Sequence, residues 1–340
     1  MRPHERSELI NELLKLIPMT KFNYKCCLVV AWIAVLFSCT SPTEKKTATE
    51  LPIPITDSTT VVETTYSLNQ NIINYQQLAT WQKDTTTSVV IIDVRPDSLY
   101  QKGHIKGAVQ LWRPDIESVH YPYKGMMLEK EDVEALMGTL GATADSKIVL
   151  YDDNGNVDAA RLWWILTTYG HLNSYLLNGG IQNASKMFVS QASTSPIPQV
   201  FHFSSSEQPH LKATKQDLLH ALTDTNTLIL DCRTTEEFIG KIIKKNAFRA
   251  GHIPQAIHLN YTHTIAYENK YCFKSNKDLA KLFKHISKHK KIIVYCQSGV
   301  RSAHTTFVLY KLLGFPNVAN YDGSWIEWSY DQTLPIAKEV

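Results

Sequence analysis

Six cysteines are few for a chain of 340 residues, and their positions exclude several kinds of site. They stand at positions 26, 27, 39, 232, 272 and 296, with no Cys-x-x-Cys pair and no cluster with histidine, so no zinc site is indicated. Excess charge is also scarce, because 35 Lys and Arg face 32 Asp and Glu. A net charge of +3 without patterning gives no indication of a nucleic-acid partner.

The sequence has no apolar run near its start that is long enough to cross a bilayer. Cys26–Phe37 is only twelve residues long and follows Lys21 and Lys25, a pattern typical of a secretory signal. It ends in Leu-Phe-Ser-Cys39, which resembles a bacterial lipobox and implies cleavage before Cys39 and lipidation of that cysteine. We therefore expect residues 1–38 to be a signal peptide. The mature protein would be an exported lipoprotein, anchored in a membrane on the periplasmic side of the cell envelope.

Three alternatives remain for this N-terminal region. It could be an ordinary cleaved signal or an uncleaved anchor, and translation could begin at Met19, directly before the charged segment. Residues 39–68 are rich in Ser, Thr, Pro and Lys, which predicts a flexible tether. In an oxidising compartment Cys232 and Cys272 could pair, but the sequence does not settle their connectivity.

Cys296 stands between an expected strand and an expected helix. Ile292–Tyr295 is an apolar, β-branched run typical of a buried strand, and Ser302–Leu313 is typical of a helix. Backbone N–H groups without partners gather at such a junction and favour thiolate over thiol. The alternative is an inert cysteine buried at the end of a strand. We favour the reactive cysteine because Gly299 and Arg301 have no evident purpose in a core turn.

The loop Cys296-Gln-Ser-Gly-Val-Arg301 resembles the Cys-x-x-Gly-x-(Arg/Thr) active-site loop of the rhodanese sulfurtransferases. The phosphatase motif differs, because it places five residues between its cysteine and its arginine. Here four residues separate Cys296 from Arg301, so arsenate or phosphate chemistry is disfavoured. A loop that is one residue shorter suits a terminal sulfur better than a phosphate with its leaving group.

The second half of the sequence repeats the first. The corresponding segments are Ile91–Arg95 and Leu228–Arg233, Gly103–Ala108 and Gly251–Ala256, Tyr151 and Tyr295, and three glycines, Gly155, Gly170 and Gly179, that recur 144 residues later. Two βα domains that arose by duplication explain this agreement. Alternating strands and helices predict an α/β fold, in which each domain has a mainly parallel sheet with helices on both faces.

Each half resembles a rhodanese domain, which implies two rhodanese-like domains in tandem. We expect the first at residues 69–189, a linker at 190–208 and the second at 209–340. Asp152 takes the place of Cys296 in the first domain. A carboxylate cannot carry a sulfane sulfur, so this domain should be catalytically silent and form one wall of a cleft. Asp152 itself is expected at a solvated loop tip or a helix N-cap.

The resemblance implies sulfur transfer in two steps through a covalent intermediate. The Cys296 thiolate takes the outer sulfur of a small anionic donor such as thiosulfate, which leaves a persulfide. A thiol, cyanide or a protein then accepts the sulfur. The main-chain N–H groups of Gln297 through Ser302 are expected to stabilise the terminal sulfur. No metal or organic cofactor is implied.

Several side chains around Cys296 have expected roles in binding the substrate. Arg301 would attract the donor or lower the thiolate pKa, unless it pairs with a carboxylate at the domain interface. Ser298 would offer a hydroxyl or shape the loop, and Gly299 would give the loop a conformation closed to larger residues. Arg249 matches a basic position that some family members use toward the acidic group of the substrate; the alternative is a solvated charge. The expected set is Gln297, Ser298, Gly299, Val300, Arg301 and Arg249.

Other motif residues are expected to be structural. They are the Asp-x-Arg pairs Asp93–Arg95 and Asp231–Arg233, the repeated His104 and His252, and the tryptophans Trp325 and Trp328 after Tyr321.

The loop composition bears on the choice of donor. Gln297 and Ser298 are neutral, whereas family members selective for thiosulfate tend to carry basic residues there. Those selective for 3-mercaptopyruvate carry Thr where this chain has Arg301. The loop matches neither group fully, and we expect thiosulfate because Arg301 restores a cation. The alternatives are a 3-mercaptopyruvate sulfurtransferase and a non-catalytic sulfur carrier or interaction module that receives sulfur on Cys296.

Overall fold

The structure is a computed structural model that describes residues 71–193 and 195–338, all of which belong to one compact unit of the chain. The predicted signal peptide, the lipidated Cys39 and the tether lie outside the described residues. Among those residues, no helix has the length and apolar character needed to span a membrane.

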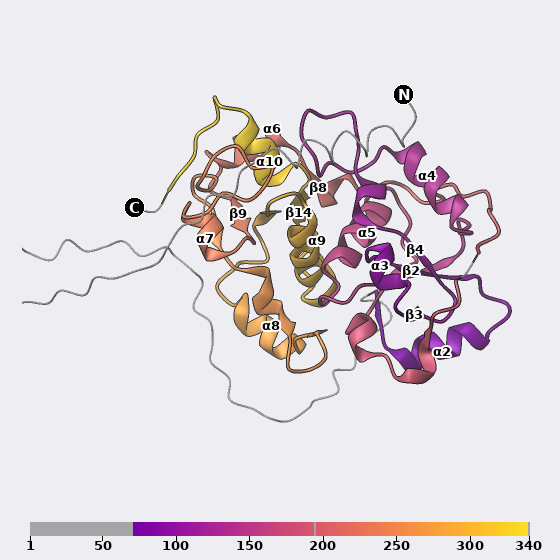
Figure 1. The fold of residues 1–340 in the computed structure, drawn as a ribbon. Helices are drawn as coiled ribbons and strands as arrows, with labels where there is room; N and C mark the ends of the chain where they lie inside the picture. The colour runs from indigo at the N-terminus through magenta and orange to yellow at the C-terminus, as the bar shows by residue number, and fades with distance from the viewer. Residues whose placement is uncertain (1–70, 194, 339–340) are drawn as a thin grey trace, which may run out of the picture. The chain divides into compact units, whose positions relative to one another are not determined.

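The first half is built on a five-stranded parallel sheet (Figure 1). In spatial order its strands are β1 (Ile72–Ile73), β6 (Ser174–Leu177), β5 (Lys147–Tyr151), β2 (Val89–Asp93) and β4 (Ala108–Gln110). Its helices are α2 (Tyr75–Lys83), α3 (Asp97–Tyr100), α4 (Lys130–Thr139) and α5 (Val157–Thr168). A capping box between Asn74 and Gln77 fixes the start of α2.

The second half repeats this topology. Its parallel sheet runs in the order β8 (Lys212–Ala213), β14 (Val318–Tyr321), β13 (Lys291–Tyr295), β9 (Thr227–Asp231) and β10 (Ile257–His258). The helices are α6 (Lys215–Ala221), α7 (Thr235–Phe238), α8 (Asn276–Leu282), α9 (Val300–Phe307), which continues as a π-helical turn (Val308–Leu312), and α10 (Ser324–Tyr330). The predicted duplication and α/β class are therefore confirmed.

Two short antiparallel pairs stand apart from the main sheets. β3 (His104–Ile105) pairs with β7 (Val189–Ser190), and β11 (Ile265–Ala266) pairs with β12 (Cys272–Phe273).

Both faces of each sheet are buried, as the apolar runs in the sequence predicted. On β13, Ile292 and Val294 join the core that contains α9, whereas Ile293 and Tyr295 face Trp325 and the other residues of a second core. This alternation follows from the period of two along a strand, and burial on both faces is characteristic of parallel sheets. Trp325 and Trp328 are core residues, as predicted.

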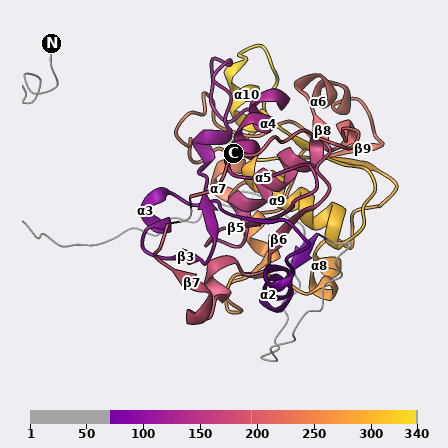
Figure 2. The ribbon, with the colours of Figure 1, turned by 90° about the vertical axis from the view of Figure 1, so that its right-hand side faces the viewer.

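The two halves pack through α5 and α9, which lie side by side at the centre of Figures 1 and 2. Every residue of α5 except Asp158 is buried, so this helix is covered on all sides. The rings of Trp163 on α5 and Phe307 on α9 meet edge to face with centroids 4.7 Å apart. One apolar core thus runs through both halves.

Replacing Phe307 by alanine should destabilise the whole unit, because its fully buried ring belongs to the shared core. We expect a loss of about 3–5 kcal/mol in the free energy of unfolding, measured by urea titration. The matched control is Phe248→Ala, whose ring is 46% exposed and whose loss should stay near about 1 kcal/mol. Equal losses in the two variants would contradict this view of the interface.

Candidate active site

The site is centred on the sulfur of Cys296, which follows the last residue of β13 and precedes α9 by three loop residues. Gly299 closes this loop with a φ of +76°, a conformation that favours glycine. A β-carbon there would lie 2.6 Å from Arg161 Nη1 and 2.7 Å from the Asp322 carbonyl oxygen. The loop therefore needs glycine both for its backbone conformation and for the close approach of Arg161.

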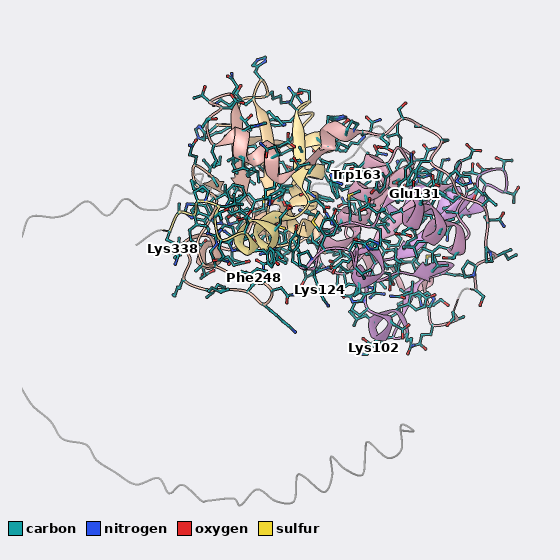
Figure 3. The ribbon with its side chains drawn as sticks, turned by 90° about the horizontal axis from the view of Figure 1, so that it is seen from above. Lys102, Lys124, Glu131, Trp163, Phe248 and Lys338 are labelled. Atoms are coloured by element: carbon teal, nitrogen blue, oxygen red, sulfur yellow. The ribbon has the colours of Figure 1, made fainter. Side chains whose placement is uncertain are left out.

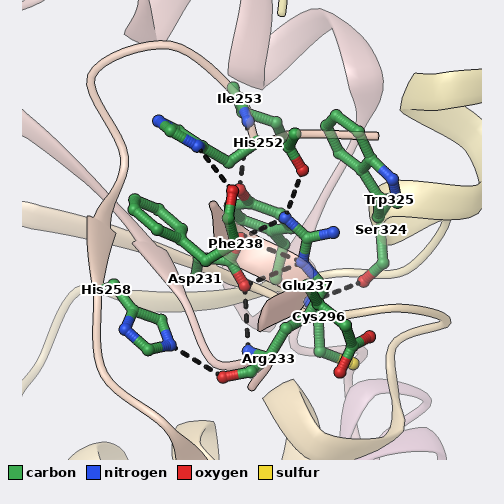
Figure 4. Close-up of polar contacts among 12 residues, drawn as sticks. Asp231, Arg233, Glu237, Phe238, His252, Ile253, His258, Cys296, Ser324 and Trp325 are labelled. Carbon is green, nitrogen blue, oxygen red and sulfur yellow. Dashed lines mark hydrogen bonds and ion pairs between the residues drawn. The ribbon is translucent and has the colours of Figure 1, made fainter. Parts of the chain in front are cut away.

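Ser324 ties the loop to the sheet (Figure 4). Its Oγ accepts hydrogen bonds from the backbone N–H of Cys296 at 3.1 Å and of Gly299 at 3.0 Å, and donates to the Tyr321 carbonyl at 2.8 Å. Ser324 itself has a φ of +50°, so its backbone is strained to reach this position. No role was predicted for Ser324, although the neighbouring Tyr321 and Trp325 marked this segment.

These bonds correct one expectation about the loop amides. We expected every N–H group from Gln297 to Ser302 to face the sulfur, but the Gly299 N–H is bound to Ser324. The amides of Ser298 and Ser302 do bind the thiol, and Ser302 Oγ donates to Sγ at 3.4 Å. Fewer loop N–H groups than predicted are therefore available to the sulfur, but a hydroxyl group also contacts it.

The surroundings of Cys296 favour the thiolate. Burial raises the pKa of this thiol, but the Arg301 charge and the hydrogen bonds from Ser302 and Ser298 outweigh burial and lower the pKa below its usual value. Arg301 is held by Glu237 of α7 through two bonds of 2.7 and 2.8 Å. Arg301 thus acts on the sulfur as expected, and it also pairs with a carboxylate, but that carboxylate belongs to its own half and not to the domain interface.

Cys296 lies at the wall of a cavity of about 460 Å³ that both halves enclose. The first half contributes Arg113, Pro114, Glu117, Lys124, Gly125, Asn154, Val157 and Asp158, and the second contributes Lys244, Lys245, Asn246, Tyr261, Cys296, Gln297, Ser298, Val300, Arg301 and Ile326. Five of these side chains are basic and two are acidic. The predicted loop residues other than Gly299 are among them.

Arg249 does not line this cavity, contrary to our expectation of a substrate contact. Its guanidinium donates to four carbonyls at and beyond the end of α10, at distances of 2.7–3.2 Å. These carbonyls belong to Trp328, Ser329, Asp331 and Leu334. Arg249 thus caps a helix end, where a cation is favoured by the helix dipole.

Asp152 fills the equivalent cradle in the first half. One carboxylate oxygen accepts from the backbone N–H of Asn154 and Asn156, and the other from Asp158 and Ala159, at 2.7–3.2 Å. The side chain is buried, so the prediction of a solvated loop tip was wrong, whereas the bonds to Asp158 and Ala159 in the first turn of α5 agree with the other expectation, a cap at the helix N-terminus. Burial and the Asp158 charge raise its pKa to about 7, against the lowering effect of the N–H groups. The Asp152 side chain therefore occupies the N–H donors of this loop.

The first half also holds the reactive loop directly, through Arg161 of α5. The guanidinium donates to Asp322 Oδ1 at 2.6 Å, to the Gly125 carbonyl at 2.8 Å and to the Gly299 carbonyl at 3.4 Å. The other oxygen of Asp322 accepts from the Met127 N–H at 3.1 Å. Both charged side chains are almost fully buried. A residue of the first half thereby positions the loop that carries Cys296.

The repeated Asp-x-Arg pairs are structural, as predicted. Arg233 binds Asp231 and donates to the Gly251 carbonyl at 2.8 Å, and Arg95 binds Asp93 and donates to the Gly103 carbonyl at 2.9 Å. His252 stacks on Phe238 and bonds to its carbonyl. Cys232 and Cys272 are both free thiols in the structure. Among the described residues, no group of three or more His, Cys, Asp or Glu could hold a metal.

The chain thus has two matching α/β domains, one with Cys296 in an amide-lined loop and one with Asp152 at the equivalent position. The family model for the Rhodanese-like domain matches residues 74–186 and 214–331. The chain therefore belongs to the rhodanese family and is a tandem-domain sulfurtransferase.

Curated relatives cover most of the chain. A Mycobacterium leprae protein provisionally named thiosulfate sulfurtransferase SseA is 36% identical over 247 residues, covering 70% of this chain and 81% of its own. A Mycobacterium tuberculosis (strain H37Rv) protein provisionally named thiosulfate sulfurtransferase is 34% identical over 260 residues, covering 73% and 91%.

Solved structures agree in fold. The anaerobic ergothioneine biosynthesis enzyme from Chlorobium limicola has a TM-score of 0.71 at 20% identity, covering 80% of this chain and 71% of that one. YnjE has a TM-score of 0.68 at 23% identity, covering 80% and 69%.

Neutralising Arg301 should raise the pKa of Cys296, because the guanidinium charge is the largest influence that lowers it. Arg301→Gln alone would leave Glu237 buried without a partner, so the test variant is Arg301→Gln with Glu237→Gln. The midpoint of the pH profile for iodoacetamide alkylation of Cys296 should move to higher pH. Arg301→Lys, which keeps the charge, should move it less. An unchanged midpoint in the double variant would refute the role of Arg301.

Removing Arg161 should lower both stability and activity, and a second substitution should restore only part of the stability. Arg161→Met leaves Asp322 buried and unpaired, which should cost about 3–5 kcal/mol of unfolding free energy in a urea titration. Adding Asp322→Asn, the residue type that the first half has at Asn178, should restore part of this stability. Sulfurtransferase activity should stay at least tenfold low, because the loop still lacks the guanidinium that joins the Gly299 carbonyl to the Gly125 carbonyl of the first half, even though Asn320 Nδ2 keeps its bond of 3.0 Å to Gly299. Recovery of activity together with stability would mean that Arg161 has only a structural role.

Proposed function

We propose that this chain is a thiosulfate sulfurtransferase that works through a persulfide on Cys296. The observation that carries the proposal is a single thiol with a lowered pKa, bound by loop amides at the wall of a cavity rich in cations. The curated relatives with thiosulfate sulfurtransferase in their names support the same reaction.

The first step would form the persulfide. The Cys296 thiolate attacks the outer sulfur of thiosulfate, the bond between the two donor sulfurs breaks, and its electron pair leaves with sulfite. The new terminal sulfur carries one negative charge, and the N–H groups of the loop that are not bound to Ser324 are its natural donors. An acceptor thiolate or cyanide then attacks this sulfur and releases the Cys296 thiolate.

The charge of the cavity favours a dianionic donor. Arg113 is paired with Asp158, and Arg301 with Glu237. Lys124, Lys244 and Lys245 line the same cavity and make no ion pair with any described residue. Three unpaired ammonium groups, set against the one remaining carboxylate of Glu117, suit thiosulfate, with two negative charges, better than 3-mercaptopyruvate with its one carboxylate. Because Gln297 and Ser298 are neutral, 3-mercaptopyruvate remains the alternative sulfur donor.

We further propose that the enzyme acts in the cell envelope, anchored by lipid on Cys39. This proposal rests on the apolar run and lipobox-like sequence alone, and retention of the protein in a detergent phase with loss on Cys39→Ser would test it.

Cys296→Ser should lower kcat/KM for thiosulfate with cyanide as acceptor by at least a thousandfold, because no sulfur nucleophile remains in the cavity. The matched control is Cys272→Ser, a free thiol outside the cavity whose pKa is raised to about 11 by burial. Wild-type kcat/KM should be at least tenfold higher for thiosulfate than for 3-mercaptopyruvate. Full activity of Cys296→Ser would end the proposal, and the reverse donor ratio would assign the alternative. A persulfide found by mass spectrometry without turnover would indicate a sulfur carrier.

A further inference from the structure

The catalytic half has a longer connection after α7 than the silent half has after α3. The same hydrogen bond, from arginine to a glycine carbonyl, spans 18 residues from Arg233 to Gly251 but only 8 from Arg95 to Gly103. The ten additional residues form a segment beside the active-site cavity, in which Lys244, Lys245 and Asn246 are lining residues. An insertion present in only one half, at the reactive site, is a candidate for function.

This segment also places apolar side chains in solvent. Ile242 is 43% exposed, Ile243 57% and Phe248 46%. They stand next to the lysines that line the cavity, in the same short segment. A dianion as small as thiosulfate can use the lysines, but it has no use for these apolar groups.

A second segment, from the first half, continues the apolar surface. The rings of Phe248 and Tyr330 meet at 5.0 Å, and Tyr330 meets Tyr123 at 5.3 Å. Tyr123 precedes Lys124, which lines the cavity, and Figure 3 shows Lys124 and Phe248 near each other. We call residues 119–124, 241–248 and Tyr330 the mouth rim. Val119, within it, is 87% exposed.

The mouth rim combines exposed apolar groups with unpaired positive charge. Lys124, Lys244 and Lys245 have no ion-pair partner among the described residues, and Lys241 is also exposed. Aromatic and aliphatic groups beside cations are typical of protein interfaces, and the charge selects a partner of opposite sign. A lipid surface would also suit apolar groups with lysines, but it offers no thiol that could take sulfur from Cys296.

We propose that the mouth rim docks an acidic protein that accepts the sulfur on a cysteine in a mobile segment reaching into the cavity. This inference rests on the proposed function. The acceptor thiolate attacks the terminal sulfur of the Cys296 persulfide, the sulfur–sulfur bond at Cys296 breaks, and its electron pair returns to the Cys296 thiolate. The acceptor leaves as a persulfide, with no external oxidant or reductant.

The test uses the full chain, loaded with thiosulfate, and synthetic acceptor peptides. One peptide has alternating acidic and apolar residues before Gly-Gly-Cys, and its control replaces every acidic residue by lysine. We expect kcat/KM for the acidic peptide to exceed that of the lysine peptide at least tenfold, and to fall as salt rises. The double variant Ile242→Ser, Ile243→Ser should lower the acidic-peptide value about tenfold, while cyanide turnover stays within twofold.

Matched substitutions and a binding assay separate the outcomes. Ile197→Ser with Val200→Ser removes side chains that are 77% and 76% exposed outside the mouth rim, and should change neither acceptor. Equal rates for both peptides, or equal loss with cyanide and peptide in the rim variant, would overturn docking. So would binding to phosphatidylglycerol vesicles that needs Ile242 and Ile243, which would make the rim a membrane surface.

If thiosulfate gave no turnover in the wild type, the proposed function would fail separately. Fluorescence polarisation of the labelled acidic peptide on the Cys296→Ser chain would then still decide whether the rim docks it, because binding needs no sulfur transfer. Binding that the rim variant loses supports docking, and binding that it keeps refutes it.

Discussion

The buried ion pair between Arg161 and Asp322 is the interaction on which the reactive loop depends. It joins the two halves, and the same guanidinium reaches the carbonyl of Gly299 inside the loop. A buried pair of charges contributes little net stability, because desolvation offsets most of the attraction, but leaving either charge alone is costly. The pair therefore acts mainly as a geometric constraint. It makes the shape of the Cys296 loop conditional on a correctly docked silent domain.

The two halves show how one loop serves two purposes. In the silent half a carboxylate, Asp152, accepts four backbone N–H groups and completes the cradle. In the catalytic half Cys296 is shorter in reach and leaves room for a terminal sulfur. The residue that holds the loop also differs, because Ser324 stands where the first half has Gly180. A β-carbon added at Gly180 would lie 2.1 Å from the Asp152 carbonyl oxygen, so a serine does not fit there. The first half thus lacks both the cysteine and the serine that holds the cysteine loop.

Local pattern predicted the fold and marked the Cys296 loop, and long-range contacts decided what it missed. The strand before Cys296, the glycine in its loop and the internal repeat follow from apolar runs and spacing, which are visible in one dimension. The Ser324 bonds and the pairing of Arg161 with Asp322 join residues 28 and 161 positions apart, and no local signal specifies them. Arg249 misled for the same reason, because its helix-end carbonyls come from residues about 80 positions later.

The same contrast explains where the catalytic half can vary. Ser324 and Arg161 both hydrogen-bond to its Cys296 loop, so substitutions in the loop would disturb the thiolate. The ten-residue extension meets this loop where Gln297 Nε2 donates to the Lys245 carbonyl at 3.3 Å, whereas the exposed side chains of Ile242 and Ile243 in the same segment make no such bond. The two halves thus differ both at the loop position of Cys296, where the first has Asp152, and at this extension, which only the second has. Selectivity for a partner can therefore change at the rim without altering the chemistry at the sulfur.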